Sequence, residues 1–138
     1  MTSMDGPLHR QDQSPAADHA SVAVQVRGLV KSFGTGETTV TVLKGIDLDV
    51  YFGELLLLVG ESGGGKTTLL SAIAGILDID AGELEVLGSS LSKMSAGTRA
   101  RFRGQRMGFI YQQFNLLPAL TAAENVAIPL LIQGVGRK

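Results

Sequence analysis

The stretch LLLLVGESGGGKTTLL, from Leu55 to Leu70, decides the fold class of this chain. It begins with an apolar run, Leu55 to Val59, which is typical of a strand covered on both faces in a parallel sheet. The run breaks into glycines, and a lysine and two threonines follow. A helix is expected from about Lys66 to Ala74, with Gly75 closing it. A buried strand, a glycine-rich loop and a helix in this order predict an α/β fold.

The glycine-rich loop, GESGGGKT from Gly60 to Thr67, matches the pattern G-x-x-x-x-G-K-[ST] at every fixed position. Glycines let consecutive backbone N–H groups form a nest for an anion, and the helix N-terminus adds partial positive charge. Lys66 is expected to reach the β- and γ-phosphates of a nucleotide, and the Thr67 hydroxyl to bind Mg²⁺. The expected nucleotide-binding residues of this loop and the helix start are Gly60, Ser62, Gly63, Gly64, Gly65, Lys66, Thr67 and Thr68. The alternative is a glycine turn that enters a helix, with the lysine in solvent.

The residues before this stretch predict an antiparallel layer. Alternating apolar residues from Val22 to Arg27 indicate a first strand, and Gly34 and Gly36 indicate a turn. The β-branched run from Thr38 to Val42 and the alternating segment from Ile46 to Val50 indicate strand structure again. An antiparallel β N-terminal layer is therefore expected beside the α/β part.

Further elements are expected after the loop. They are a short strand from Gly82 to Gly88, a basic helix from Ser95 to Gly104, a strand from Met107 to Tyr111 and a last helix beginning near Thr121. Thr121 and Glu124 form the sequence pattern of a capping box at the start of that helix. Pro129 is expected to kink or end it.

Composition sets limits on function. The chain has 138 residues, and its 12 Lys and Arg nearly balance its 13 Asp and Glu, so nothing indicates bulk attraction to nucleic acid or acidic lipid. The absence of cysteine excludes disulfides, thiol catalysis and cysteine metal sites. Residues 1–20 are polar and are expected to be a disordered tail rather than a signal peptide. The apolar runs are too short to span a bilayer, which favours a soluble or peripheral protein.

Kinases, GTPases and transport ATPases all use such a loop, and three further features distinguish among them. The first is LVKSFGTGE, which contains Phe33 at the end of a strand. The second is MGFIYQQFNLLP, from Met107 to Pro118, and the third is LPALTAAENVAIPLL, from Leu117 to Leu131. With these features the chain resembles the ATPase subunits of ABC transporters over about residues 22–138. It most closely resembles the group that serves macrolide-export and lipoprotein-release systems.

The resemblance implies a P-loop NTPase fold of the ABC ATPase type, present here in incomplete form. It implies ATP and Mg²⁺ as ligands, with Phe33 stacking on adenine, although an aromatic at this place also suits a core. Gln112, in the family's Q-loop, is implied to bind the metal or to position water. Gly64 stands where the family often has serine or cysteine, and we expect little effect because glycine preserves the nest.

The resemblance also implies partners. A transmembrane permease subunit would be contacted through the region from Phe114 to Pro118, and a second ATPase subunit would pair with the full-length protein. The implied location is peripheral, at the cytoplasmic face of the plasma (inner) membrane. No nucleic-acid partner is expected: the basic residues are read as a solvated helix face because only Phe102 interleaves with them. They are Lys93, Arg99, Arg101, Arg103 and Arg106.

The family's hydrolytic cycle also needs an LSGGQ-like signature, an apolar strand ending in Asp-Glu (Walker B) and a downstream histidine. None of these occurs in the 138 residues. Residues 21–138 are therefore expected to be the N-terminal part of an ABC ATP-binding domain, from the Walker A loop to just past the Q-loop, and inactive alone. Two readings stay open: part of a transporter ATPase that couples ATP binding and hydrolysis to export, or a nucleotide-binding module that never hydrolyses. A P-loop nucleotide kinase is disfavoured by the Q-loop run and the antiparallel layer.

Overall fold

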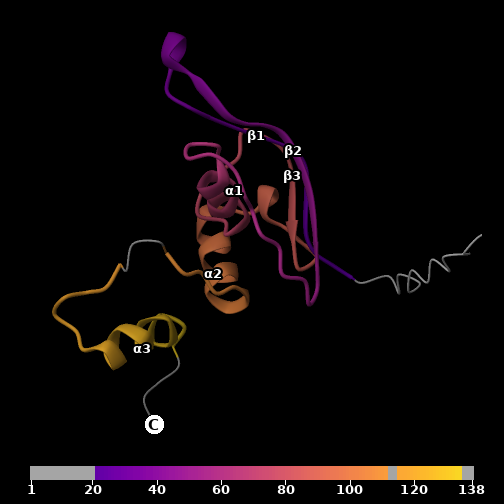
Figure 1. Cartoon of the computed structure of the whole chain (residues 1–138). Helices are drawn as coiled ribbons and strands as arrows, with labels where there is room; N and C mark the ends of the chain where they lie inside the picture. The colour runs from indigo at the N-terminus through magenta and orange to yellow at the C-terminus, as the bar shows by residue number, and fades with distance from the viewer. Residues whose placement is uncertain (1–20, 112–114, 135–138) are drawn as a thin grey trace, which may run out of the picture.

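A computed structural model describes residues 21–111 and 115–134 of the chain. The expected tail, residues 1–20, lies outside these ranges. The strands are β1 (Val22–Phe33), β2 (Val40–Tyr51), β3 (Ala81–Val86) and β4 (Ser89–Ser90). The helices are α1 (Lys66–Ile73), α2 (Ala96–Arg106) and α3 (Ala122–Ile132), with short 3₁₀ turns η1 (Gly36–Thr38) and η2 (Leu91–Lys93). Figure 1 shows that the β1–β2 hairpin extends beyond the rest of the sheet and ends in η1.

The four strands form one antiparallel sheet in the order β2-β1-β3-β4. The central strand, β1, brings Val26 opposite Leu48 of β2 and Leu84 of β3. Next to this pairing, Arg27 forms an ion pair with Asp49 at 2.6 Å, which holds the pKa of that carboxyl below its usual range. The expected antiparallel layer is confirmed, although β1 and β2 are longer than the sequence segments that indicated them.

The hydrophobic core lies between this sheet and α1. Its buried members come from β1 (Val26, Leu29), β2 (Leu43), β3 (Leu84, Val86), α1 (Leu69, Ala72) and η2 (Leu91). Phe102 of α2 and the following Met107 pack against the same cluster. The core therefore joins the sheet to the helix that begins at the glycine-rich loop, and it fixes where that loop stands.

The helices begin where their capping residues predict. Ser95 caps α2 by accepting from the N–H of Thr98, and Thr121 and Glu124 complete the capping box of α3. The backbone N–H of Thr121 lowers the pKa of Glu124. Pro129 does not end α3, which continues to Ile132. The ring removes one backbone donor, while the next turn still forms, with the N–H of Gln133 donating to the carbonyl of Pro129 at 3.2 Å.

Two expected strands do not form. Leu55 to Val59 does not form a strand, and the Leu57 side chain is 79% exposed. Met107 to Tyr111 does not form one either, and the Ile110 side chain is 97% exposed. A strand requires a backbone partner, and the described sheet offers neither segment one. The expectation of a parallel sheet around Leu55 to Val59 is therefore wrong for the described residues. Only Leu58 of this run packs against the core.

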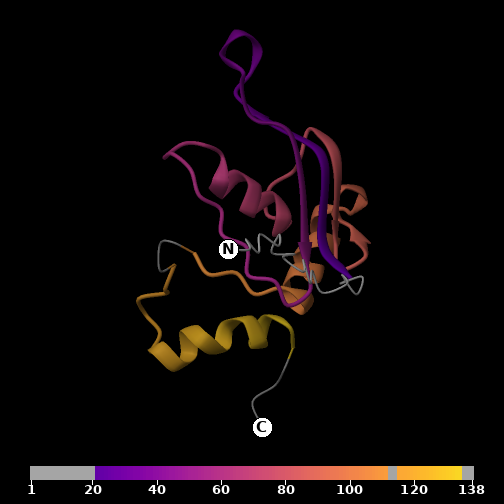
Figure 2. The ribbon, with the colours of Figure 1, turned by 45° about the vertical axis from the view of Figure 1, so that its right-hand side comes forward.

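Helix α3 stands apart from the sheet in both views (Figures 1 and 2). Its end is tied to α2 by the Gln133 side chain, which donates to the Gly104 carbonyl. The Asn125 side chain binds the preceding loop by accepting from the Leu117 N–H at 2.8 Å and donating to the Leu120 and Thr121 carbonyls.

Among the helices of residues 21–111 and 115–134, none has the length and the apolar character that a membrane-spanning helix needs.

Candidate functional site

The glycine-rich loop has the backbone geometry of an anion nest. Gly63 and Gly65 have φ values of +82° and +81°, in the left-handed region, whereas Gly64 between them does not. Alternation of left-handed and ordinary residues points successive N–H groups toward one side of the chain. The N–H of Gly64 closes the turn by donating to the Glu61 carbonyl at 3.2 Å. The glycine cluster therefore supplies the conformation for which the sequence singled it out.

Helix α1 extends this donor set. Gly65 is its N-cap residue, and the N–H of Leu69 donates to the Gly65 carbonyl at 2.8 Å. The N–H groups of Lys66, Thr67 and Thr68 precede that first bond and are left by helix geometry without intrahelical acceptors. Together the loop and this first turn line a pocket of about 260 Å³, formed by Ser62, Gly63, Gly64, Gly65, Lys66, Thr67 and Thr68. All predicted phosphate-binding residues except Gly60 line it.

Lys66 is held by the loop that precedes it. Its ammonium donates to the Gly60 carbonyl at 2.7 Å and also to the Glu61 carbonyl. The Lys66 side chain therefore folds back over the loop and does not extend away from it. The three ion pairs found in the described ranges involve other residues, so no carboxylate neutralises Lys66 there. Lys66 is therefore a positioned cation that no carboxylate within the described ranges neutralises.

The nest is fixed to the sheet through Gly65. A Cβ atom on this residue would lie 3.1 Å from Leu43 Cδ2 and 3.2 Å from Val42 Cγ1, both on β2. Leu43 belongs to the buried core, so it has little room to withdraw. The position of the nest thus depends on a glycine for two reasons, its φ value and its contact with β2.

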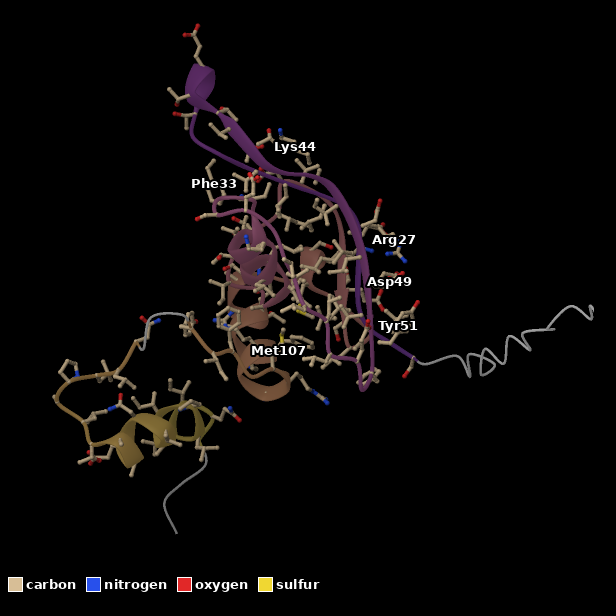
Figure 3. The ribbon with its side chains drawn as sticks, viewed as in Figure 1. Arg27, Phe33, Lys44, Asp49, Tyr51 and Met107 are labelled. Carbon is tan, nitrogen blue, oxygen red and sulfur yellow. The ribbon has the colours of Figure 1, made fainter. Side chains whose placement is uncertain are left out.

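Phe33 lies at the same end of the β1–β2 hairpin as the nest. It is the last residue of β1, pairs with Val40 of β2 and is 44% exposed. Val42, two residues along β2, is one of the two β2 residues that abut Gly65. Figure 3 shows the Phe33 side chain at this end of the sheet. Phe33 is not among the buried core residues, which removes the core interpretation and leaves its stacking on adenine as a prediction.

The remaining predicted residues have mixed outcomes. Gln112 and Phe114 lie outside the described residues. In the part of the permease-facing region that is described, Leu116 and Leu117 are exposed. Thr67 is exposed at the mouth of the nest, and Glu61 is exposed as well. No group of three His, Asp or Glu side chains that could hold a metal occurs within residues 21–111 and 115–134.

The basic residues of α2 are not a uniformly solvated face. Arg99 forms an ion pair with Asp78, and only 14% of its side chain is exposed. Arg103 donates to the Gly75 carbonyl at 3.1 Å, at the C-terminal end of α1. The solvated-face interpretation is wrong for these two residues, because Arg99 reaches the Asp78 carboxylate beyond α1 and Arg103 reaches a carbonyl at the end of α1. Arg101 and Arg106 are exposed.

Comparison with known proteins places this site in a family. A family model described as ABC transporter matches residues 43–137, which is more than half of the chain. The chain belongs to the ABC transporter family. It carries part of the ATPase-type nucleotide-binding domain of that family, as the sequence features indicated. Proteins with this domain bind nucleotide.

Individual proteins similar to this chain support the same family. The chain is 45% identical over 111 residues to the Uncharacterized ABC transporter ATP-binding protein YbbA of Escherichia coli K12, covering 80% of this chain and 49% of the relative. It is 48% identical over 113 residues to the lipoprotein-releasing system ATP-binding protein LolD 1 of Caulobacter vibrioides, covering 82% and 48%. Among solved structures, the dimeric ATP-binding cassette MJ0796 bound to ADP and Pi matches with a TM-score of 0.78 and 32% identity, covering 83% and 50%. The chain spans about half the length of these relatives.

Two residues that hold the elements around the site carry no signal in the sequence. Asp80, just before β3, binds Lys31 and the end of β1, and Arg103 binds the end of α1. These contacts join residues 49 and 28 positions apart in the chain. No local pattern marks an aspartate or an arginine as the partner of so distant a backbone group.

Proposed function

We propose that the loop of residues 60–67 and the first turn of α1 bind the phosphates of ATP. The observation that carries this proposal is the position of Lys66, whose ammonium is held at an anion nest and is not neutralised by any described carboxylate. Helix N–H groups and a lysine are the donors that nucleotide phosphates take. The nest, the helix terminus and the cation converge on one pocket.

The same pocket suits a magnesium ion that accompanies the phosphates. Thr67 is exposed in the first turn of α1, and a hydroxyl oxygen is the type of ligand that Mg²⁺ accepts. Thr67 would hold the ion, with Gln112 as a further ligand or water-positioning residue. When bound, Mg²⁺ neutralises phosphate charge. The protein's own share is to orient the phosphates, through the nest and Lys66.

At the other end of the nucleotide, Phe33 would stack on adenine. Its ring is half-exposed at the hairpin end where Gly65 contacts β2. Stacking of a base on an aromatic side chain contributes roughly 1–3 kcal/mol, which is enough to distinguish ATP from inorganic triphosphate. The base and phosphate sites would both belong to residues 21–138, which we propose to be the N-terminal part of an ABC ATP-binding domain following a tail of residues 1–20.

For the whole protein we propose an ATPase subunit that couples ATP hydrolysis to export through a membrane permease. The name of its relative LolD 1 and the dimeric structure of the cassette MJ0796 support this wider role. The permease would contact the region from Phe114 to Pro118, a second ATPase subunit would complete the site, and the subunit would lie at the cytoplasmic face of the inner membrane.

The 138 residues by themselves are proposed to hold MgATP without turning it over. The nest, Lys66, Thr67 and Gln112 would surround the phosphates from one side, whereas γ-phosphate transfer needs donors around its whole surface and a carboxylate base for the attacking water. Glu61 is exposed, and the Glu124 carboxylate accepts from Thr121 in the capping box. Neither carboxylate is placed as a base.

Calorimetric titration of the 138-residue chain with MgATP tests binding. Lys66→Ala should weaken binding at least about tenfold, because a hydrogen bond to a charged group contributes roughly 1.5–3 kcal/mol. Lys44→Ala, which removes the same charge from an exposed site on β2, should bind as the unchanged chain does. Equal ATP affinity in the unchanged chain and Lys66→Ala would refute the assignment. A phosphate-release assay tests hydrolysis, and multiple turnovers that depend on Lys66 would contradict the proposal of binding alone.

A further inference from the structure

Asp80 holds the end of β1 with three hydrogen bonds. Its carboxylate accepts from the Ser32 N–H at 2.6 Å and from the Lys31 ammonium at 2.8 Å, and its own N–H donates to the Val30 carbonyl at 2.9 Å. These bonds span residues 30 to 32, so the backbone that leads to Phe33, the last residue of β1, is held in place. The hydrogen bond from Lys31 and that from Ser32 also hold the pKa of Asp80 below its usual range, which keeps the carboxylate charged near neutral pH.

The Lys31 ammonium lies over the ring of Phe33. The distance from Nζ to the ring centroid is 5.6 Å, within the range in which a cation is attracted to an aromatic face. Only 12% of the Lys31 side chain is exposed, so water screens this attraction little. Phe33 keeps 44% of its surface exposed, although a cation occupies one of its faces.

We propose that Lys31 is a positioning residue for base recognition: held by Asp80, its ammonium covers one face of Phe33 and leaves the other face for the base of a nucleotide. This inference rests on the proposed stacking of adenine on Phe33. It adds that the affinity of the stacked base depends on a cation that does not touch the nucleotide.

The physical effect has two parts. The cation fixes the ring plane, so less side-chain freedom is lost when a base stacks on it. It also draws π-electron density toward its own side, which makes the open face less negative and a better partner for an electron-rich purine. Both parts act on the base and leave the phosphates unaffected, because the ammonium is already engaged by Asp80.

A direct contact between Lys31 and phosphate is the competing reading. The Asp80 carboxylate at 2.8 Å opposes it, because an approaching phosphate would have to displace a bonded counter-charge. Lys66, in contrast, is bonded to neutral carbonyls, which a phosphate displaces at lower cost. The two lysines are therefore placed for different parts of the ligand.

The test compares MgATP with inorganic triphosphate by calorimetry on the full 138-residue chain. Lys31→Met should weaken ATP about two- to fivefold, the range of a cation–π contact, and leave the affinity for triphosphate unchanged. Lys31→Arg should retain ATP affinity, and Lys44→Met, an exposed lysine on the neighbouring strand, is the matched control for lost charge (Figure 3). In a Phe33→Ala background, Lys31→Met should have no further effect on ATP.

Each other outcome overturns the inference in a distinguishable way. Equal weakening of ATP and triphosphate by Lys31→Met would make Lys31 a phosphate contact. An undiminished effect in the Phe33→Ala background would show that Lys31 does not act through the ring. If Phe33→Ala leaves the ratio of the ATP and triphosphate affinities unchanged, base stacking itself fails, and the inference fails with it while phosphate binding stands.

A check without ligand is the NMR chemical shift of the Lys31 ε-methylene protons. This shift should move downfield in Phe33→Leu, because the ring current of Phe33 is lost. No movement would also overturn the inference.

Discussion

Replacing Gly65 with alanine should destabilise the fold far more than the same change at either neighbouring glycine. At +81°, the φ of Gly65 costs an alanine about 1–2 kcal/mol. The new Cβ would also lie 3.1 Å from Leu43 Cδ2 and 3.2 Å from Val42 Cγ1, and such crowding of a core costs about 1–3 kcal/mol. The free energy of unfolding should therefore fall by about 2–5 kcal/mol, a large share of the stability of a typical small domain.

The neighbours separate the two contributions. Gly63 has a left-handed φ but open space around its added Cβ, so Gly63→Ala should cost only the backbone term of about 1–2 kcal/mol. Gly64 has an ordinary φ, and its Cβ would meet only the Glu61 backbone oxygen at 3.2 Å, so Gly64→Ala should cost only a small shift of the turn and less than Gly65→Ala. Urea unfolding of the three variants measures the order. Loss of a cooperative transition in Gly65→Ala alone would agree with the reasoning, and equal stability of Gly65→Ala and Gly64→Ala would refute it.

Three other perturbations address separate parts of the molecule. The pKa of Asp80 is lowered in the folded state, so its pairing with Lys31 stabilises the fold above the unfolded pKa of about 3.8, and this stabilisation is lost as pH falls through the folded pKa. Urea unfolding should therefore give a lower free energy of unfolding at pH 3 than at pH 7. Asp80→Asn should reduce this difference between the two pH values. Asn125→Ala should speed hydrogen exchange at the Leu117 amide, which donates to the Asn125 side chain, and unchanged exchange would contradict that role. Leu57 is an apolar side chain that is 79% exposed and favours self-association, so Leu57→Asp should increase the monomeric fraction measured by light scattering. An unchanged chain that is already monomeric at high concentration would contradict this prediction.

Local signals in the sequence predicted those parts of the fold that depend on nearby residues. The Thr121–Glu124 capping box, the glycines of the nest and the alternating residues of β1 each act within a few positions, and each has the expected structure. The family followed from the resemblance of three longer motifs to ABC ATPase subunits, and the match over residues 43–137 confirms it.

The failures concern structure that needs a distant partner. The apolar run from Leu55 to Val59 indicates burial but not by what, and no described strand pairs with it. The hydrogen bonds from Arg103 to the end of α1 and from Lys31 to Asp80 could not be predicted either. A polar side chain that binds a distant element produces no periodic pattern in the sequence. The functions of Phe33 and Lys66 stay predictions, now with a defined geometry.

The bond from Arg103 to the Gly75 carbonyl changes how α1 acts on a distant anion. A helix has about half a positive charge at its first turn and about half a negative charge at its last, so its two ends partly cancel when seen from afar. With eight residues, α1 is only about 12 Å long, which makes that cancellation substantial. The guanidinium of Arg103 offsets the partial negative charge at the last turn, so that charge no longer subtracts from the positive potential of the first turn. An anion is thus drawn toward the first turn of α1 from farther away than the helix alone would allow, and added salt should slow its arrival.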